Sequence, residues 1–178
     1  MTAPALSFTE DQTFAALRAV LLGMVGPGVE VIMAQDNMVP APLVGDYILT
    51  TPTRRTRLAT NVVSWAEPAP DSLDRETSTE LDVQLDVHGP SSGDTVEVIV
   101  SLMRDAYAVD AFAAQGLAVT ILSAEDGAQM AFVNDQNQYE DRWVLNVSLQ
   151  AKPVISTGQQ FADTLTAGLI EVDTTYPP

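Results

Sequence analysis

Eight residues of alternating character, Leu81 to His88, constrain the fold of this chain more than any other segment. Leucine or valine occupies every odd position. The even positions are polar: Asp82, Gln84, Asp86 and His88. Side chains along a β-strand point to opposite faces in turn, so this pattern predicts a strand with one buried face and one solvent-facing face. Gly89-Pro90 ends it, because proline has no amide hydrogen and disfavours helix in the residue before it.

A helix is predicted directly after this strand. Ser91 and Asp94 resemble a capping box, in which the first side chain accepts a hydrogen bond from the backbone at the helix start. Apolar residues then recur at helical spacing, at Val96, Ile99, Val100 and Met103. The pattern predicts an amphipathic helix over 92–105. A strand, a tight turn and a helix in succession form a scaffold and do not by themselves form an active site.

Further elements are predicted along the whole chain. Thr9 and Gln12 fit a capping box for a helix over 9–24. A short apolar strand at 29–34, a proline-rich loop at 36–44 and a short helix at 107–115 are also expected. Asp126-Gly127 is typical of a hairpin turn. The main sheet strands are expected at about 47–65, 78–88, 117–133 and 139–152.

These elements together predict an α+β fold. We expect a single domain over 1–178, with a mixed, mostly antiparallel sheet and helices packed on one face, and 153–178 as a possible extended C-terminal arm. The strand-like region at 47–65 is broken by Pro52, which suits a hairpin or a bent edge strand. The expected buried set is Phe14, Leu17, Leu21, Leu85, Val87, Ile99, Met103, Trp143 and Leu145. The scattered aromatic residues are also expected to pack in the core, namely Tyr47, Trp65, Tyr107, Tyr139, Trp143 and Tyr176.

No catalytic, cofactor-binding or metal-binding residues are predicted. The chain has no cysteine, which excludes disulfides, thiolate metal sites and cysteine nucleophiles. Its one histidine, His88, ends the polar face of its strand, and we interpret it as a solvent-exposed turn residue. Ser91 or Ser92 could in principle join His88 in a triad, but no nucleophile elbow accompanies them. The chain is therefore not expected to be an enzyme.

The charge of −16 is unevenly distributed. Residues 1–57 hold four arginines and five acids, and residues 58–178 hold four cations and nineteen acids, so their net charges are −1 and −15. An acidic surface repels phosphate backbones, which disfavours general nucleic-acid binding. It is either an ordinary solvated face or a surface that lets nucleic acid pass without holding it. No apolar run approaches 18 residues, so no membrane partner is expected.

Arg54, Arg55 and Arg57 form the one cationic cluster in the sequence. On a strand, Arg55 and Arg57 would share a face, and Arg54 would point the other way. Two interpretations remain open. The arginines either blunt an edge strand against aggregation, or they form an ion-pair interface with an acidic neighbouring subunit.

The order of several motifs resembles the neck or tail terminator proteins of long-tailed bacteriophages. The N-terminal helix is followed by Val31-Ile32-Met33-Ala34-Gln35-Asp36-Asn37, and later by Gln84, Asp86 and Gly89 at the end of a strand. Leu102-Met103-Arg104-Asp105 closes the next helix. The segment from Tyr139 to Val147 resembles the late strand of the family with its arginine, Arg142.

The resemblance implies a structural virion subunit of the neck or tail end, assembled in the host cytoplasm. Such a subunit is expected to form a ring, usually a hexamer, that terminates the tail tube and joins it to the head connector. Its implied partners are itself, a tail tube or sheath protein and a head–tail connector protein, while DNA passes through the ring without specific binding. No cofactor is implied. The alternative is a small ligand-binding or enzyme-accessory α+β domain with a pocket over the sheet.

Overall fold

The computed structural model describes residues 3–34, 45–65, 72–133, 139–159 and 168. The predicted proline-rich loop at 36–44 and most of the predicted C-terminal arm lie outside the described residues. Within them are three helices: α1 (Glu10–Met24), α2 (Ser92–Met103) and α3 (Ala106–Ala113). The strands form one large sheet, one smaller sheet and a short pair. The α+β fold with a mixed sheet is therefore confirmed.

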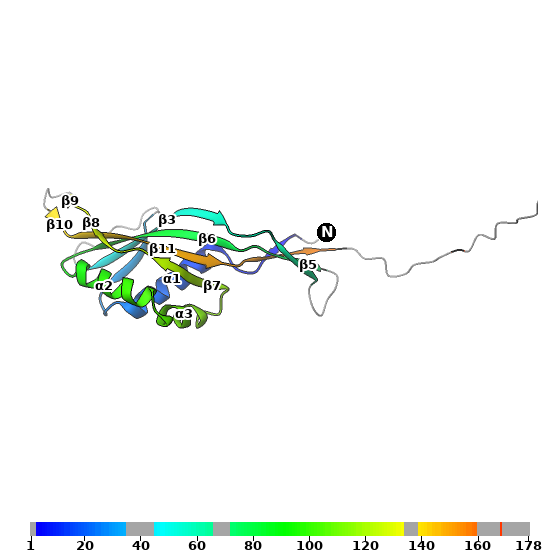
Figure 1. Ribbon diagram of the computed structural model, residues 1–178, viewed down its shortest axis with the longest axis horizontal. Coiled ribbons are helices and arrows are strands. Elements are labelled where there is room, and N and C mark those ends of the chain that lie inside the picture. Colours follow the sequence, from blue (N-terminus) through cyan, green and yellow to red (C-terminus); the bar gives the residue numbers. More distant parts are fainter. Residues whose placement is uncertain (1–2, 35–44, 66–71, 134–138, 160–167, 169–178) are drawn as a thin grey trace, which may run out of the picture.

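The large sheet forms the body of the molecule. Its strands, in spatial order, are β2 (Glu30–Met33), β3 (Tyr47–Arg57), β6 (Thr79–His88), β11 (Arg142–Ala151) and β7 (Val119–Ala124), with β8 (Ala128–Gln129) also paired to β11. β2 is parallel to β3, and the other pairs are antiparallel. All three helices lie on one side of this sheet (Figure 1). The predicted placement of the helices on one face is correct.

A second sheet of four antiparallel strands projects beyond the helices, and we call it the extension sheet (Figure 1). Its strands, in spatial order, are β1 (Ala5–Leu6), β12 (Val154–Gly158), β5 (Ser72–Glu76) and β4 (Val62–Trp65). Only Thr77 and Ser78 separate β5 from β6, and only Lys152 and Pro153 separate β11 from β12. The two central strands of the body therefore run on into the extension sheet.

The helix α1 begins where its capping box predicts. The Oγ1 of Thr9 accepts a hydrogen bond from the Gln12 amide at 3.3 Å, and the Oε1 of Gln12 accepts one from the Thr9 amide at 2.8 Å. These contacts satisfy two amides that the first helical turn would otherwise leave unpaired. Leu17 and Leu21 on its inner face are fully buried.

The core lies between the helices and the odd-numbered face of β6 and β11. Every residue of the expected buried set is buried except Trp143, which packs only partly buried against the core. The wider expectation for the aromatic residues is wrong at three positions: Trp65, Tyr107 and Tyr139 are exposed. Tyr139 lies in β10 (Tyr139–Glu140), which pairs with β9 (Phe132–Val133) at the far end of the body. Tyr176 lies outside the described residues.

Two local predictions are wrong. Ser91 precedes α2 but its side chain makes no capping hydrogen bond to that helix, because its hydroxyl donates to Asp46 instead. Asp126-Gly127 does not form a hairpin turn. The flanking strands β7 and β8 do not pair with each other, since both pair with β11.

Pro52 marks a bend in β3, as predicted for this region. The register with β6 shifts between Pro52 and Arg54, and proline is tolerated at such bulges because it cannot donate to the ladder. β2 covers only Tyr47 to Thr50, so the later half of β3 forms an edge of the sheet. The region is a bent strand followed by β4, which pairs with β5 rather than back onto β3.

Candidate functional site

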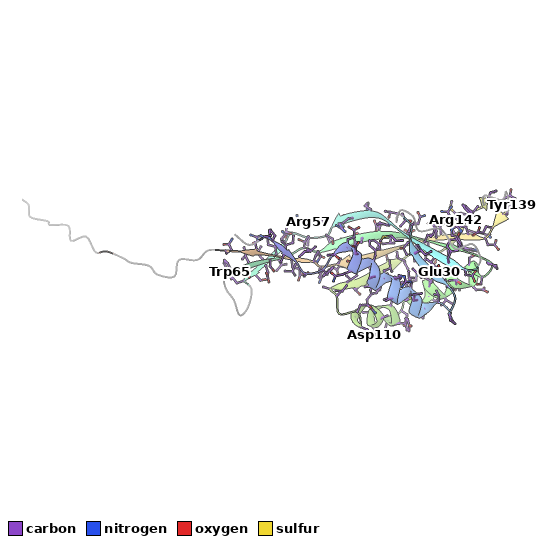
Figure 2. The ribbon with its side chains drawn as sticks, turned by 180° about the vertical axis from the view of Figure 1, so that it is seen from behind. Glu30, Arg57, Trp65, Asp110, Tyr139 and Arg142 are labelled. Atoms are coloured by element: carbon purple, nitrogen blue, oxygen red, sulfur yellow. The ribbon has the colours of Figure 1, made fainter. Side chains whose placement is uncertain are left out.

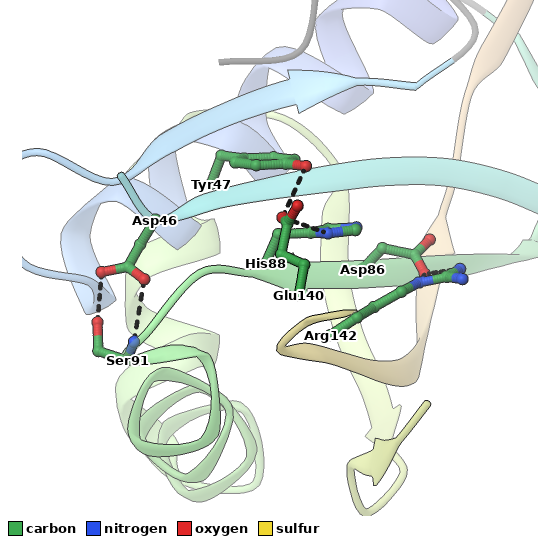
Figure 3. A network of polar contacts seen from close by, with 7 residues as sticks. All are labelled: Asp46, Tyr47, Asp86, His88, Ser91, Glu140 and Arg142. Carbon is green, nitrogen blue, oxygen red and sulfur yellow. Dashed lines mark hydrogen bonds and ion pairs between the residues drawn. The ribbon is translucent and has the colours of Figure 1, made fainter. Parts of the chain in front are cut away.

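Seven side chains form a polar network where β6 ends, and we call it the β6-end network: Asp46, Tyr47, Asp86, His88, Ser91, Glu140 and Arg142 (Figure 3). They come from the start of β3, the end of β6, the turn before α2, and β10 with the start of β11. Segments far apart in the sequence therefore meet at one end of the body sheet.

Asp86 and Arg142 form a largely buried ion pair within this network. The Nε of Arg142 donates to the Oδ1 of Asp86 at 2.9 Å, and an Nη2 hydrogen bond reaches the same oxygen. The other oxygen, Oδ2, accepts a hydrogen bond from the amide of Gln84 at 2.8 Å. The carboxylate is almost fully buried, and both of its oxygens have partners, as a buried charge requires. The guanidinium also lies over the ring of Phe132, 5.8 Å from its centroid.

His88 lies beside this pair and is buried, so its interpretation as an exposed turn residue is wrong. Its ring stacks on Tyr47 with centroids 4.6 Å apart, and the edge of Phe132 meets it at 5.3 Å. Its Nδ1 lies 3.2 Å from the Oε1 of Glu140. The Tyr47 hydroxyl donates to that same oxygen at 3.3 Å. The polar face of β6 is thus covered at this end, although Asp82 and Gln84 remain partly exposed.

Burial governs the protonation of both rings. It lowers the pKa of His88 below its ordinary value of 6.5, and the neighbouring Glu140 acts in the opposite direction without reversing the shift. Burial and then the Glu140 charge raise the pKa of Tyr47 to about 12. Near neutral pH the network therefore contains a neutral imidazole and a neutral phenol.

Gly89 permits the turn between β6 and α2. Its φ is +111°, which side-chain-bearing residues rarely adopt, and a Cβ there would lie 2.2 Å from the Oδ1 of Asp46. The same Oδ1 accepts a hydrogen bond from the Ser91 amide at 3.1 Å, while Oδ2 accepts one from the Ser91 hydroxyl. The close approach of Asp46 to this turn is possible only because residue 89 has no side chain.

The network does not assemble a hydrolytic triad. The Ser91 hydroxyl donates to Asp46, and the nearest acid to His88 is Glu140 on a different strand. In the described part of the chain, no three histidine or acidic side chains gather closely enough to hold a metal ion. The network ties β3, β6, β11 and the start of α2 together. We interpret it as the element that fixes this end of the body.

Arg54, Arg55 and Arg57 lie together on the free edge of β3. Arg54 pairs with Asp82 at 3.0 Å, and Arg55 pairs with Glu10 at 3.1 Å. Arg57 donates to the carbonyl of Ala59 at 2.9 Å and to the side chain of Asn61. Both ion pairs are largely exposed to solvent.

Sequence reasoning missed Asp46, Tyr47 and Glu140 as members of one network. Asp46 gave no signal of its own, because its partners Gly89 and Ser91 lie more than forty residues away. Glu140 stands in the Tyr139–Val147 segment that carries the family resemblance, so that motif was the available signal. The motif residues Gln84, Asp86, Gly89 and Arg142 all meet in or beside the network.

Comparison with known proteins agrees with this arrangement of motifs. The family described as "Phage neck terminator protein" matches residues 11–176 of the chain. The match spans nearly the whole sequence, and the chain belongs to this family. Membership assigns it a structural role in the phage neck and tail, as part of the virion and in contact with other head and tail proteins. A search of curated proteins found no match. Among the described residues, no helix is long and apolar enough to cross a membrane.

Proposed function

We propose that this chain assembles with copies of itself into a ring, a hexamer, that terminates the tail tube and joins it to the head connector. The family match over residues 11–176 is the observation that carries this proposal. The ring acts by assembly, without catalysis or a cofactor. It contacts a tail tube or sheath protein on one side and the connector on the other, and it is assembled in the host cytoplasm.

A closed ring requires a heterologous interface, in which one surface meets a different surface on the next subunit. The two edges of the body sheet differ in the way that such an interface needs. The β3 edge carries Arg54, Arg55 and Arg57. The β7 edge and the adjoining α3 carry mostly acids near their exposed ends. The cations there are Arg104, which is already paired with Asp126 at 2.8 Å, and Lys152, which lies beside the start of β7. Opposite charges on opposite edges favour head-to-tail contact.

The arginine cluster is the proposed interface on the β3 edge. Arg54 and Arg55 already have acidic partners within the chain, but exposed pairs of this kind contribute at most about 1 kcal/mol each to stability. Their guanidinium groups can therefore exchange those partners for carboxylates of a neighbour at little cost. Arginine suits this role, because its planar fork binds a carboxylate through two hydrogen bonds.

The acidic surface explains how DNA passes through the ring. Residues 58–178 carry a net charge of −15. Such a surface repels the phosphate backbone, so a lumen lined by it neither holds DNA nor reads its sequence.

The experiment is negative-stain microscopy and light scattering of the purified protein, alone and with assembled tails. Rings with a central hole are expected for the parent chain. The Arg54→Glu/Arg55→Glu/Arg57→Glu variant should lose ring formation while its melting temperature changes little. The triple lysine variant is the control, because it keeps the charge and should still form rings. If the glutamate variant forms rings equally well, the arginines are not the interface. The interpretation of a charged edge strand that prevents aggregation would then hold.

A further inference from the structure

The extension sheet has one apolar face and one polar face. Directly paired residues on neighbouring strands point to the same side of a sheet, and the pairing places one set together: Leu6, Val63, Trp65, Leu73, Arg75, Ile155 and Thr157. We call this the apolar face of the extension sheet. The opposite side carries Ser64, Asp74, Glu76 and Ser156 besides Val62 and Val154.

This apolar face continues the face that the helices cover in the body. In β6 and β11 the odd-numbered residues form the core, including Leu81 and Ala151. The odd-numbered residues of β5 and β12 form the apolar face. A groove of about 340 Å³ joins the two regions, and its lining includes Leu81, Ala151, Leu6 and Ile155. One apolar surface therefore runs from the core of the body out along the extension sheet.

The helices stop before this surface does. All three lie under the body sheet, and the described residues place no helix over the extension sheet (Figure 1). Its apolar side chains are consequently exposed: Leu6 by 51%, Val63 by 57%, Trp65 by 52% and Ile155 by 39%. A sheet face of this composition is normally buried against a second layer. Among the residues that the structure describes, no such second layer covers this face.

Arg75 indicates the charge of the missing layer. It lies in the middle of the apolar face, and its Nη1 donates to the Thr157 hydroxyl at 2.5 Å. Within the described ranges it makes no ion pair, because the neighbouring acids Asp74 and Glu76 point to the opposite face. Among the described residues its side-chain partner is this hydroxyl, and a partly buried guanidinium is better satisfied by a carboxylate.

A surface with matching properties lies on the body of the same chain, on α3 and β7. Val109 and Leu122 are exposed there by 48% and 46%. Val109 lines two neighbouring hollows of about 460 and 310 Å³, which Leu122 and Leu117 also help to line. Asp110 follows on the same helix, is exposed, and makes no ion pair with any residue that the structure describes. Figure 2 shows Asp110 on the helical side of the body and Trp65 out on the extension sheet.

We propose that the apolar face of the extension sheet docks on the α3–β7 surface of a second copy of this chain, with Arg75 facing Asp110 of that copy. The two surfaces consist of different residues on different parts of the molecule, one on the extension sheet and the other on the α3–β7 part of the body. The contact is therefore heterologous and repeats from copy to copy. This inference rests on the proposed ring and names the surfaces that build it.

The absence of cysteine makes a clean crosslinking test possible. A Val63→Cys protein is mixed with a Val109→Cys protein under mild oxidation, and a covalent dimer is expected. The Val63→Cys/Val109→Cys double variant should form a ladder of covalent multimers. Ser64→Cys is the matched control, because Ser64 is an exposed neighbour on the same strand that points to the opposite face. Its mixture with Val109→Cys should give no dimer.

A charge exchange provides the second measurement. Arg75→Asp and Asp110→Arg should each reduce assembly, and the double exchange should restore it. Rings that form without the Val63–Val109 crosslink, or a double exchange that restores nothing, would overturn the docking while leaving the ring intact. Coverage of the face by residues 160–178 of the same chain, or by a tail protein, would also appear as rings without this crosslink. A chain that stays monomeric under all conditions would overturn the ring and the docking together.

Discussion

Arg142 on β11 reaches diagonally to Asp86 on β6, because its direct partner across the ladder is His88. The diagonal leaves the His88 ring free to stack on Tyr47 and to approach Glu140. Two polar pairs thereby share one small end of the sheet without competing for the same partner. Because both pairs are buried, a substitution in either of them should change the stability of the protein.

Replacing Asp86 with alanine should destabilise the protein strongly. Arg142 would remain partly buried without its carboxylate, and breaking such a pair from one side costs about 3–5 kcal/mol. Arg54→Ala is the matched control, since its pair with Asp82 is exposed and contributes about 1 kcal/mol or less. Urea unfolding of both variants measures the difference. Equal losses in the two variants would contradict the assignment of a buried, satisfied pair at Asp86.

Gly89→Ala should also be strongly destabilising. The positive φ costs about 1–3 kcal/mol for a residue with a side chain, and the new Cβ would displace the Asp46 carboxylate from Ser91. Gly116→Ala is the control, because Gly116 has a φ of +70° but open space around it. Thermal melts should show a clearly larger loss at position 89. A similar loss at both positions would mean that the contact with Asp46 contributes nothing.

Stability should fall as the pH decreases below about 6.5, the ordinary pKa of histidine. Burial keeps the pKa of His88 lower in the folded chain, so the unfolded chain takes up a proton that the folded chain resists. The charged and titratable groups facing the ring are Tyr47, Asp86, Glu140 and Arg142, and their combined effect leaves the downward shift in place. One such proton changes the free energy of unfolding by at most about 1.4 kcal/mol per pH unit.

The His88→Gln variant isolates this effect. Carboxylates titrate in both proteins, so their contribution cancels when the two are compared. Urea unfolding between about pH 7.5 and about pH 5.5 should show a smaller decrease for the variant than for the parent. Parallel curves would show that His88 does not resist protonation.

Ile99→Asp should unfold the protein. The Ile99 side chain is fully buried in the core, and an unpaired charge there costs several kcal/mol. Val98→Asp is the control on the same helix, because Val98 is largely exposed. Circular dichroism should show a folded Val98 variant and an unfolded or strongly destabilised Ile99 variant. A parent-like melt for Ile99→Asp would mean that the buried face of α2 is assigned wrongly.

Free duplex DNA should not bind the protein detectably at physiological salt. The net charge of −15 over residues 58–178 repels phosphates, and the few cations are mostly engaged with acids or carbonyls. An electrophoretic mobility assay over a range of salt concentrations measures this. A shift at low salt that disappears at high salt would instead indicate an electrostatic nucleic-acid site.

Local patterns in the sequence were enough to predict the elements of the body. The alternation from Leu81 to Val87 defines the buried face of β6, and the Thr9–Gln12 capping box defines the start of α1, because both depend on neighbours close in sequence. Local patterns cannot show what covers a polar face. His88 was expected to be exposed, but Tyr47 and Phe132 bury it from segments more than forty residues away.

The same limit explains the errors at Ser91 and in the extension sheet. Ser91 has the residue type of a helix cap, but its hydroxyl donates a hydrogen bond to Asp46, which is distant in the sequence. Trp65 has the residue type of a core aromatic, but its strand lies beyond the helices that would have covered it. In both cases the residue type was informative, and the missing information was which distant segment lies opposite.

The near-continuity of β5 with β6 and of β11 with β12 has a mechanical consequence. A pull on the extension sheet along its strands enters the body through the two central strands of the large sheet. The ladder hydrogen bonds between antiparallel strands lie perpendicular to that pull, so the ladders that join β6 to β3 and β11 to β7 are loaded in shear. The hydrogen bonds of such a ladder would have to break together rather than one after another. This resistance suits a subunit placed between the head and the tail of the virion.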